Sequence, residues 1–193
     1  MSMLCILSRV TAAQAQAMRA DPVVANELLH EPLPPAAVKT GLLARLAGKV
    51  PPPPPPRKAD WIGAAQQYAV DQQWHILHFL LTGLPEGGDF PACFLCKDGE
   101  EVGVDVGYGR PRLFTAAQAG RVAAHLRALD EAEVQRRYAP ADINRHDIYW
   151  LAEGSDADHR QEAQWLWETM QEVAAFAEDA ARDGGGGLVV EIY

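Results

Sequence analysis

The sequence predicts an α+β fold, in which a small mixed or antiparallel sheet packs with several helices. The sheet is expected to contain an N-terminal strand, a central hairpin and a C-terminal strand. Two aliphatic runs near the chain ends, at 3–10 and 188–193, predict the terminal strands, and an Asp-Gly pair at 98–99 predicts the hairpin. Because both terminal runs are aliphatic, we expect these strands to be central in the sheet.

The N-terminal third begins with this strand and continues into two helices. Residues 3–10 (MLCILSRV) are rich in aliphatic side chains, which is typical of a strand buried on both faces. Thr11 and Gln14 form a capping-box pattern, so a helix should begin there and end near Asp21-Pro22. A short helix over 23–30 follows, with Leu28 and Leu29 facing inward.

A proline-rich segment interrupts the pattern after residue 30. Six consecutive prolines at 51–56 favour an extended polyproline II conformation. We interpret the Pro-rich loop at about 47–59 as a solvated spacer within a single domain spanning 1–193. The alternative is a ligand for an aromatic-grooved recognition domain.

The central region is expected to contain a helical segment and then the hairpin. Residues 60–82 have a helical pattern in one or two pieces, ended by the breakers at 84–88. The apolar run that includes Cys93–Cys96 should form the first hairpin strand. In the second strand, Val102, Val104 and Val106 would share one face.

The C-terminal half is mostly helical. Thr115 and Gln118 form a second capping box that opens a helix to about Leu129, and a short helix should follow from Asp130 to about Tyr138. Pro140 begins an irregular or helical piece. The longest helix is predicted over 159–182, followed by glycines and the last strand. Its apolar side is centred on Leu166, Met170, Val173 and Ala177.

Composition restricts the classes of partner. The chain has 193 residues, 48% hydrophobic and 22% charged, with a net charge of −9. This acidity argues against nucleic acid as the main partner and against attraction to anionic membranes. The apolar N-terminal run is too short for a signal peptide, and no run is long enough for a membrane span. Three cysteines without an export signal predict reduced thiols and a cytoplasmic location.

The most informative stretch is QQWHILHFLLTG at 72–83, where two histidines lie in an otherwise apolar helix. On a helical wheel, Asp71, His75, His78 and Thr82 align along one polar stripe. The stripe has three interpretations: ligands for Zn²⁺ or Fe²⁺, one wall of an acid–base or ligand pocket, or buried side chains that hydrogen-bond within the core. The third is the default for a buried histidine.

Two further motifs, a cysteine pair and a glycine turn, have spacings that are found in functional sites. Cys93 and Cys96 have the spacing of zinc and redox sites, but side chains three residues apart on a strand point to opposite faces, which favours apolar packing. Gly107-Tyr108-Gly109 precedes Arg112 and is typical of a tight turn. It also offers a phenol and a guanidinium to a cleft near the end of the sheet.

Taken together, MSMLCILSRVTAAQAQAM, WHILHFLLTG, VGYGRPRLFTAAQ, DIYW and the long last helix make the chain resemble the YfbM-like family of bacterial proteins of unknown function. The resemblance covers nearly the whole chain. It implies a single α+β domain and a bacterial cytosolic protein, and it implies no activity. By position, the resemblance carries over His75, His78, Thr82, Tyr108 and Gly109. It therefore implies that the helix stripe and the glycine turn belong to one site.

Two functions remain open at this point. The first is a non-enzymatic protein-interaction or ligand-binding module, favoured by acidity, by five tryptophans and five tyrosines, and by the lack of a complete catalytic motif. The alternative is a small-molecule hydrolase or isomerase, metal-dependent or not, that uses Asp71, His75 and His78. No cofactor is predicted beyond that metal, and the oligomeric state is left open. The expected pocket consists of Asp71, His75, His78, Thr82, Tyr108 and Arg112.

Overall fold

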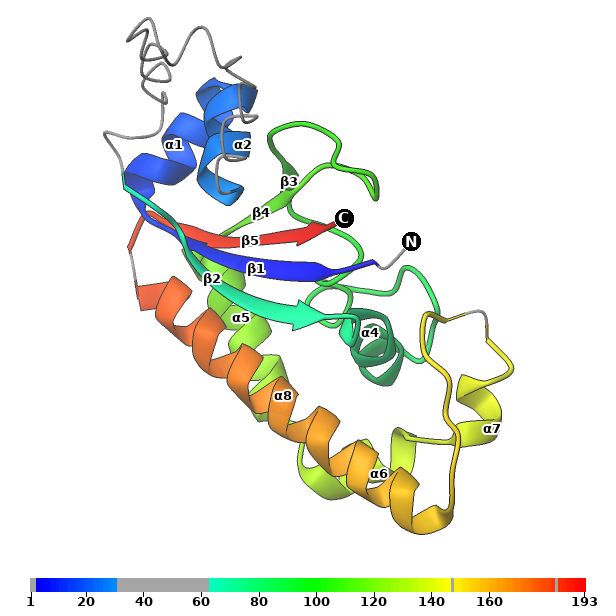
Figure 1. The fold of residues 1–193 in the computed structure, drawn as a ribbon. Coiled ribbons are helices and arrows are strands. Elements are labelled where there is room, and N and C mark those ends of the chain that lie inside the picture. Colours follow the sequence, from blue (N-terminus) through cyan, green and yellow to red (C-terminus); the bar gives the residue numbers. More distant parts are fainter. Residues whose placement is uncertain (1–2, 31–62, 147, 183) are drawn as a thin grey trace, which may run out of the picture.

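The computed structural model describes residues 3–30, 63–146, 148–182 and 184–193. Its centre is a five-stranded antiparallel sheet in the order β2-β1-β5-β4-β3 (Figure 1). The terminal strands lie side by side within it, and Leu4 and Tyr193 exchange backbone hydrogen bonds of 2.8 and 3.0 Å. The α+β fold with central terminal strands is therefore confirmed. The strands are β1 (Cys5–Val10), β2 (Gln66–Asp71), β3 (Glu100–Glu101), β4 (Arg112–Thr115) and β5 (Gly187–Ile192).

Helices cover both faces of this sheet. α1 (Ala12–Ala20) and α2 (Pro22–Leu29) lie on one face, and α5 (Ala116–Arg127) and α8 (Asp156–Arg182) lie on the other (Figure 1). All six residues of β5 are consequently buried. Leu188 and Val190 pack in the core with α8, whereas Val189 packs with α1 and α2. Burial on both faces explains the unbroken aliphatic runs at the chain ends.

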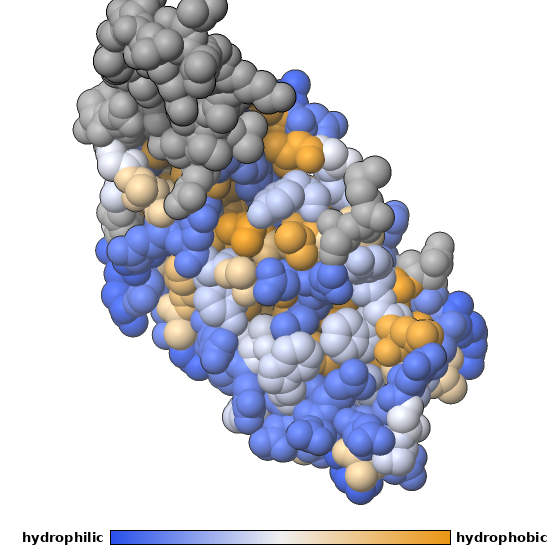
Figure 2. Space-filling view, viewed as in Figure 1, coloured by the Kyte–Doolittle hydropathy of each residue, from blue (hydrophilic) through white to orange (hydrophobic). Residues whose placement is uncertain are grey.

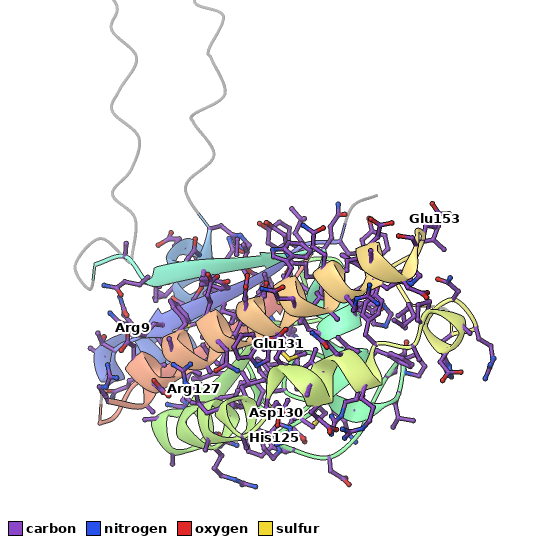
Figure 3. All side chains as sticks on the ribbon, turned by 90° about the horizontal axis from the view of Figure 1, so that it is seen from below. Arg9, His125, Arg127, Asp130, Glu131 and Glu153 are labelled. Atoms are coloured by element: carbon purple, nitrogen blue, oxygen red, sulfur yellow. The ribbon has the colours of Figure 1, made fainter. Side chains whose placement is uncertain are left out.

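The helices predicted from capping patterns are confirmed. Thr11 and Thr115 each accept a hydrogen bond from the backbone N–H three residues later, and both capping boxes are complete. α6 (Glu131–Arg137) and α7 (Pro140–Ile143) follow α5. α8 buries Leu166, Met170, Val173 and Ala177, as its pattern predicted. Seen from below, α8 runs beside α5, and the Nε of Arg127 on α5 donates to Glu178 on α8 at 2.9 Å (Figure 3).

The prediction of helix throughout 60–82 is wrong in its first part. Residues 60–62 lie outside the described residues, and Gln66–Asp71 form the edge strand β2, which pairs with β1. Pairing with a neighbouring strand overrides the helical preference of a segment rich in Ala and Gln. Asp71, at φ 53°, ends the strand, and the helix α4 (Trp74–Thr82) begins three residues later. The breakers after it are confirmed, since Gly83 ends α4 in the left-handed conformation.

The hairpin is also placed wrongly. Residues 90–96 form consecutive turns, and the backbone N–H groups of Cys96 and Lys97 both donate to the Cys93 carbonyl at 2.9 Å. The antiparallel pair is instead β3 with β4, joined by residues 102–111. Val102 is buried but Val104 is 45% exposed, so the valines share no strand face. Asp98 and Gly99 both have positive φ, but they precede β3 and do not join two paired strands.

No helix within the described ranges is long and apolar enough to cross a membrane. The Pro-rich loop predicted at about 47–59 lies outside the described residues.

Candidate functional site

A cavity of about 510 Å³ lies where the first turn of α4 meets two loops. One loop contributes Pro85, Glu86 and Gly87, and the other contributes the glycine turn around Tyr108. Cys96 and Lys97 come from the end of the turns that replace the predicted strand. The full lining is Trp74, His75, Pro85, Glu86, Gly87, Cys96, Lys97, Gly107, Tyr108 and Gly109.

Two stacked rings from α4 form the inner wall of this cavity. The indole of Trp74 and the imidazole of His75 lie 4.6 Å apart and nearly parallel, at 7°. The Nδ1 of His75 accepts the Tyr149 backbone N–H at 2.8 Å, which assigns the proton to Nε2. Nε2 lies 2.8 Å from the Pro85 carbonyl and donates to it. Because both nitrogens are hydrogen-bonded to backbone, His75 offers no free lone pair to a metal or a substrate in this arrangement.

The indole N–H of Trp74 is unpaired. Trp74 is only 1% exposed, and its Nε1 finds no hydrogen-bond partner in the part of the chain that the structure describes. A buried donor without an acceptor costs about 1–3 kcal/mol.

Tyr108 lines the cavity beside Trp74. Its ring lies 5.5 Å from Trp74, tilted by 60°, and the residue is 48% exposed. Asp105 organises the loop that presents it, because Asp105 Oδ1 accepts the backbone N–H groups of Gly107 at 2.8 Å and Gly109 at 3.3 Å. Both glycines have positive φ, which only glycine adopts readily. The short sequence Asp-Val-Gly-Tyr-Gly thus holds one aromatic ring over the cavity.

Two titratable groups in the cavity lining, Tyr108 and Cys96, have raised pKa values. Burial and then the Glu86 carboxylate raise the pKa of the Tyr108 phenol. Burial raises the pKa of the Cys96 thiol to about 12; the Arg112 guanidinium lowers it and Glu86 raises it. The thiol and the phenol are therefore both protonated at neutral pH, and both lie in the field of the same carboxylate.

The structure separates the other predicted site residues from this cavity. His78 is fully buried, and neither ring nitrogen has a partner among the described residues; burial, then the charges of His75 and Arg112, lowers its pKa to about 4. Thr82 Oγ1 hydrogen-bonds the His78 carbonyl at 2.8 Å. Arg112 donates to the Phe94 and Leu95 carbonyls at 3.1 and 2.5 Å, which holds the turns in place. Asp71 ends β2 and is exposed, so it does not continue the stripe.

Of the six predicted residues, His75 and Tyr108 are thus brought together. The described ranges contain no group of three or more His, Cys, Asp and Glu side chains placed to hold a metal ion. The Cys93 thiol instead donates to the Asp98 carboxylate at 3.0 Å. Cys93 and Cys96 do not lie on a strand that would point their thiols to opposite faces, because this segment is a turn.

Sequence reasoning missed Trp74, Glu86, Cys96 and Lys97 as cavity residues. Glu86 lies in Leu84-Pro85-Glu86-Gly87-Gly88, which signals only a break in structure. Cys96 and Lys97 were assigned to a hairpin that does not form. The one available signal was Trp74, an aromatic residue directly beside His75 at the start of the helix.

A second hollow of about 490 Å³ lies along the first half of α8. Its lining includes the exposed Trp165 and the carboxylates of Glu153, Asp158, Glu162 and Glu168. Glu153 lies just before α8, at the end far from Arg9 and Arg127 (Figure 3). On the face drawn in Figure 2, hydrophilic residues predominate and hydrophobic ones form small patches between them. The aromatic cavity is therefore the stronger candidate site.

Comparison with known proteins places this fold in a family. Residues 1–190 match the family described as domain of unknown function DUF1877, and the chain belongs to that family. It is similar to the crystal structure of YfbM, a protein of unknown function from Escherichia coli, with a TM-score of 0.61 and 16% identity. That similarity covers 98% of this chain and 99% of YfbM. The predicted resemblance to YfbM-like proteins is confirmed. No curated protein matches.

The three cysteines should differ sharply toward thiol reagents. Cys5 and Cys93 are fully buried, whereas Cys96 is partly exposed in the cavity. We expect N-ethylmaleimide to modify Cys96 first in the native protein, at least about a hundredfold more slowly than a free thiol at pH 7.5, because only the thiolate reacts. Peptide mass spectrometry after timed labelling measures this. Preferential labelling of Cys5 or Cys93 would contradict the cavity assignment.

Proposed function

We propose that this protein is a non-enzymatic ligand-binding module, which takes a small organic molecule into the cavity that Trp74 and Tyr108 help to line. The observation that carries the proposal is a cavity whose lining includes two neighbouring aromatic rings, those of Trp74 and Tyr108. Ligand sites are typically concave, largely apolar and supplied with a few polar groups. A volume of about 510 Å³ is within the range of such sites.

The geometry favours binding over the alternative, a hydrolase or isomerase that uses Asp71, His75 and His78. General acid–base catalysis needs a ring nitrogen within reach of the substrate. His75 uses both nitrogens on backbone groups, His78 is fully buried, and Asp71 is exposed at the end of another element. In this arrangement His75 serves as a wall of the site.

Cys96 provides a direct test of this function. A fragment library would be screened by ligand-observed NMR against the wild-type protein and against protein labelled at Cys96 with N-ethylmaleimide, which places a bulky group in the cavity. We expect hits whose signals disappear on labelling and weaken in Tyr108→Ala.

The matched control for labelling is Cys96→Ala, which cannot be modified at this position and should keep the hits after the same treatment. Thermal unfolding checks that every form is folded. If the library gives no hits, or if the hits persist after labelling of Cys96, the cavity is not a ligand site and the proposal is wrong.

A further inference from the structure

The cavity mouth combines an exposed aromatic face with a carboxylate. The Tyr108 ring contacts Trp74 at 5.5 Å between centroids, and the residue nevertheless remains 48% exposed. Glu86 is exposed and lines the same cavity. Aromatic faces carry a negative quadrupole that attracts cations, most strongly when the cation is an organic ammonium that sheds its water easily.

From this arrangement we infer that the ligand is an organic ammonium ion, which lies against Tyr108 with its charge balanced by Glu86. The inference rests on the proposed function, because it names the chemical class of ligand for the same cavity. Trp74 and His75 would supply the apolar wall of the site.

Lys97 also lines the cavity and is the argument for the opposite class, an anionic ligand. Two observations favour the cation over the anion. The exposed Tyr108 ring is a surface that attracts cations, and the chain as a whole carries a net charge of −9. Replacing each of the two charged lining residues in turn decides between the classes.

The test uses three probes of matched shape: choline, its neutral isostere 3,3-dimethylbutan-1-ol, and the anion 3,3-dimethylbutanoate. Isothermal titration calorimetry would measure each against the wild-type protein. We expect choline to bind at millimolar or lower concentration and both other probes to bind at least about fivefold more weakly, the ratio that corresponds to a cation–π contact of about 1 kcal/mol.

Matched variants assign the charge. Glu86→Gln should weaken choline binding about fivefold, whereas Lys97→Gln should leave it unchanged or strengthen it. Glu153→Gln, in the acidic hollow beside Trp165, controls for cations attracted to the acidic surface and should have no effect. Circular dichroism and thermal unfolding would confirm that the variants are folded.

Three outcomes would overturn the inference. Equal affinity for choline and its neutral isostere would mean an apolar site, and stronger binding of 3,3-dimethylbutanoate with loss in Lys97→Gln would mean an anion site. No choline binding at millimolar concentration would exclude the ammonium class. In each case, fragment hits that depend on Cys96 would leave the proposed function standing, so the two failures are distinguishable.

Discussion

Replacing His75 with alanine is expected to lower the free energy of unfolding by about 3 kcal/mol, whereas replacing His78 with leucine should leave it unchanged or raise it. The two histidines lie one helical turn apart on α4 and are almost equally buried, at 5% and 0% exposure. Their opposite responses follow from their hydrogen bonds. His75 joins α4 to the Pro85 carbonyl and the Tyr149 N–H, and it stacks on Trp74.

Loss of the His75 ring would leave both backbone groups without their partner and open a void beside Trp74. Replacing His78 should have the opposite effect on stability, because its ring nitrogens have no partners in the described part of the chain. Leucine removes an unpaired polar group at similar volume, which is favourable in a core.

Urea unfolding at pH 7, followed by circular dichroism, measures both changes. His75→Gln is a useful third variant, since its amide can still donate and accept. Wild-type stability in His75→Ala would mean that the ring does not hold these loops together. A large loss in His78→Leu would mean that His78 has a partner, such as a buried water.

Sequence reasoning succeeded here wherever local chemistry decides the structure. Thr11 with Gln14 and Thr115 with Gln118 predicted two helix starts because a capping box needs only residues three positions apart. The terminal strands were predictable because burial on both faces leaves an unbroken aliphatic signature. In contrast, β2 forms only because β1 offers it an edge, and residues 90–96 turn where Arg112, distant in sequence, binds their carbonyls.

The candidate site divides in the same way. His75 and Tyr108 were predicted to share a site because the WHILHFLLTG and GYG motifs, in this order, resemble the YfbM-like family. The two residues do line one cavity. Asp71 was expected on the same helix face as His75. It lies instead at the end of β2, before α4 begins, so a helical wheel does not describe its position relative to His75. Glu86 and Cys96 reach the cavity from irregular loops, whose paths no periodic pattern describes.

The other large effect is expected at Glu191, a carboxyl group inside the sheet. Glu191 is only 2% exposed in β5, and burial raises its pKa to about 7. The Nε2 of His30, at the end of α2, lies 3.0 Å from the Oε1 of Glu191. Burial lowers the pKa of His30, so the charged form of this imidazole is disfavoured. The contact lacks hydrogen-bond geometry, since Oε1 has no hydrogen-bond partner among the described residues. The carboxyl group is therefore favoured in its neutral form.

A carboxyl group whose pKa is higher in the folded state than in the unfolded state binds protons more tightly when folded. Its contribution to stability is full below the unfolded value of 4.5 and is lost as the pH rises through about 7. Glu191→Gln removes this loss. We expect the variant to be more stable than wild type by up to about 3 kcal/mol at pH 8, and to differ little at pH 4.5.

His78 should give stability the opposite dependence on pH. Its pKa is lowered from 6.5 to about 4, so the unfolded chain binds the proton first and stability falls as the pH drops from 6.5 toward 4. Urea unfolding of wild type, Glu191→Gln and His78→Leu from pH 4.5 to 8 separates the two slopes. Glu191→Gln should remove the loss of stability that occurs as the pH rises from 4.5 to about 7, and His78→Leu should remove the loss that occurs as the pH falls from 6.5 to about 4. The two windows overlap, but the two slopes have opposite signs, so each variant is identified by the sign of the slope it removes. The exposed Glu153→Gln should change neither slope. If Glu191→Gln proves less stable than wild type at pH 8, Glu191 is ionised there and paired with a protonated His30, and the assignment of a neutral carboxyl group is wrong.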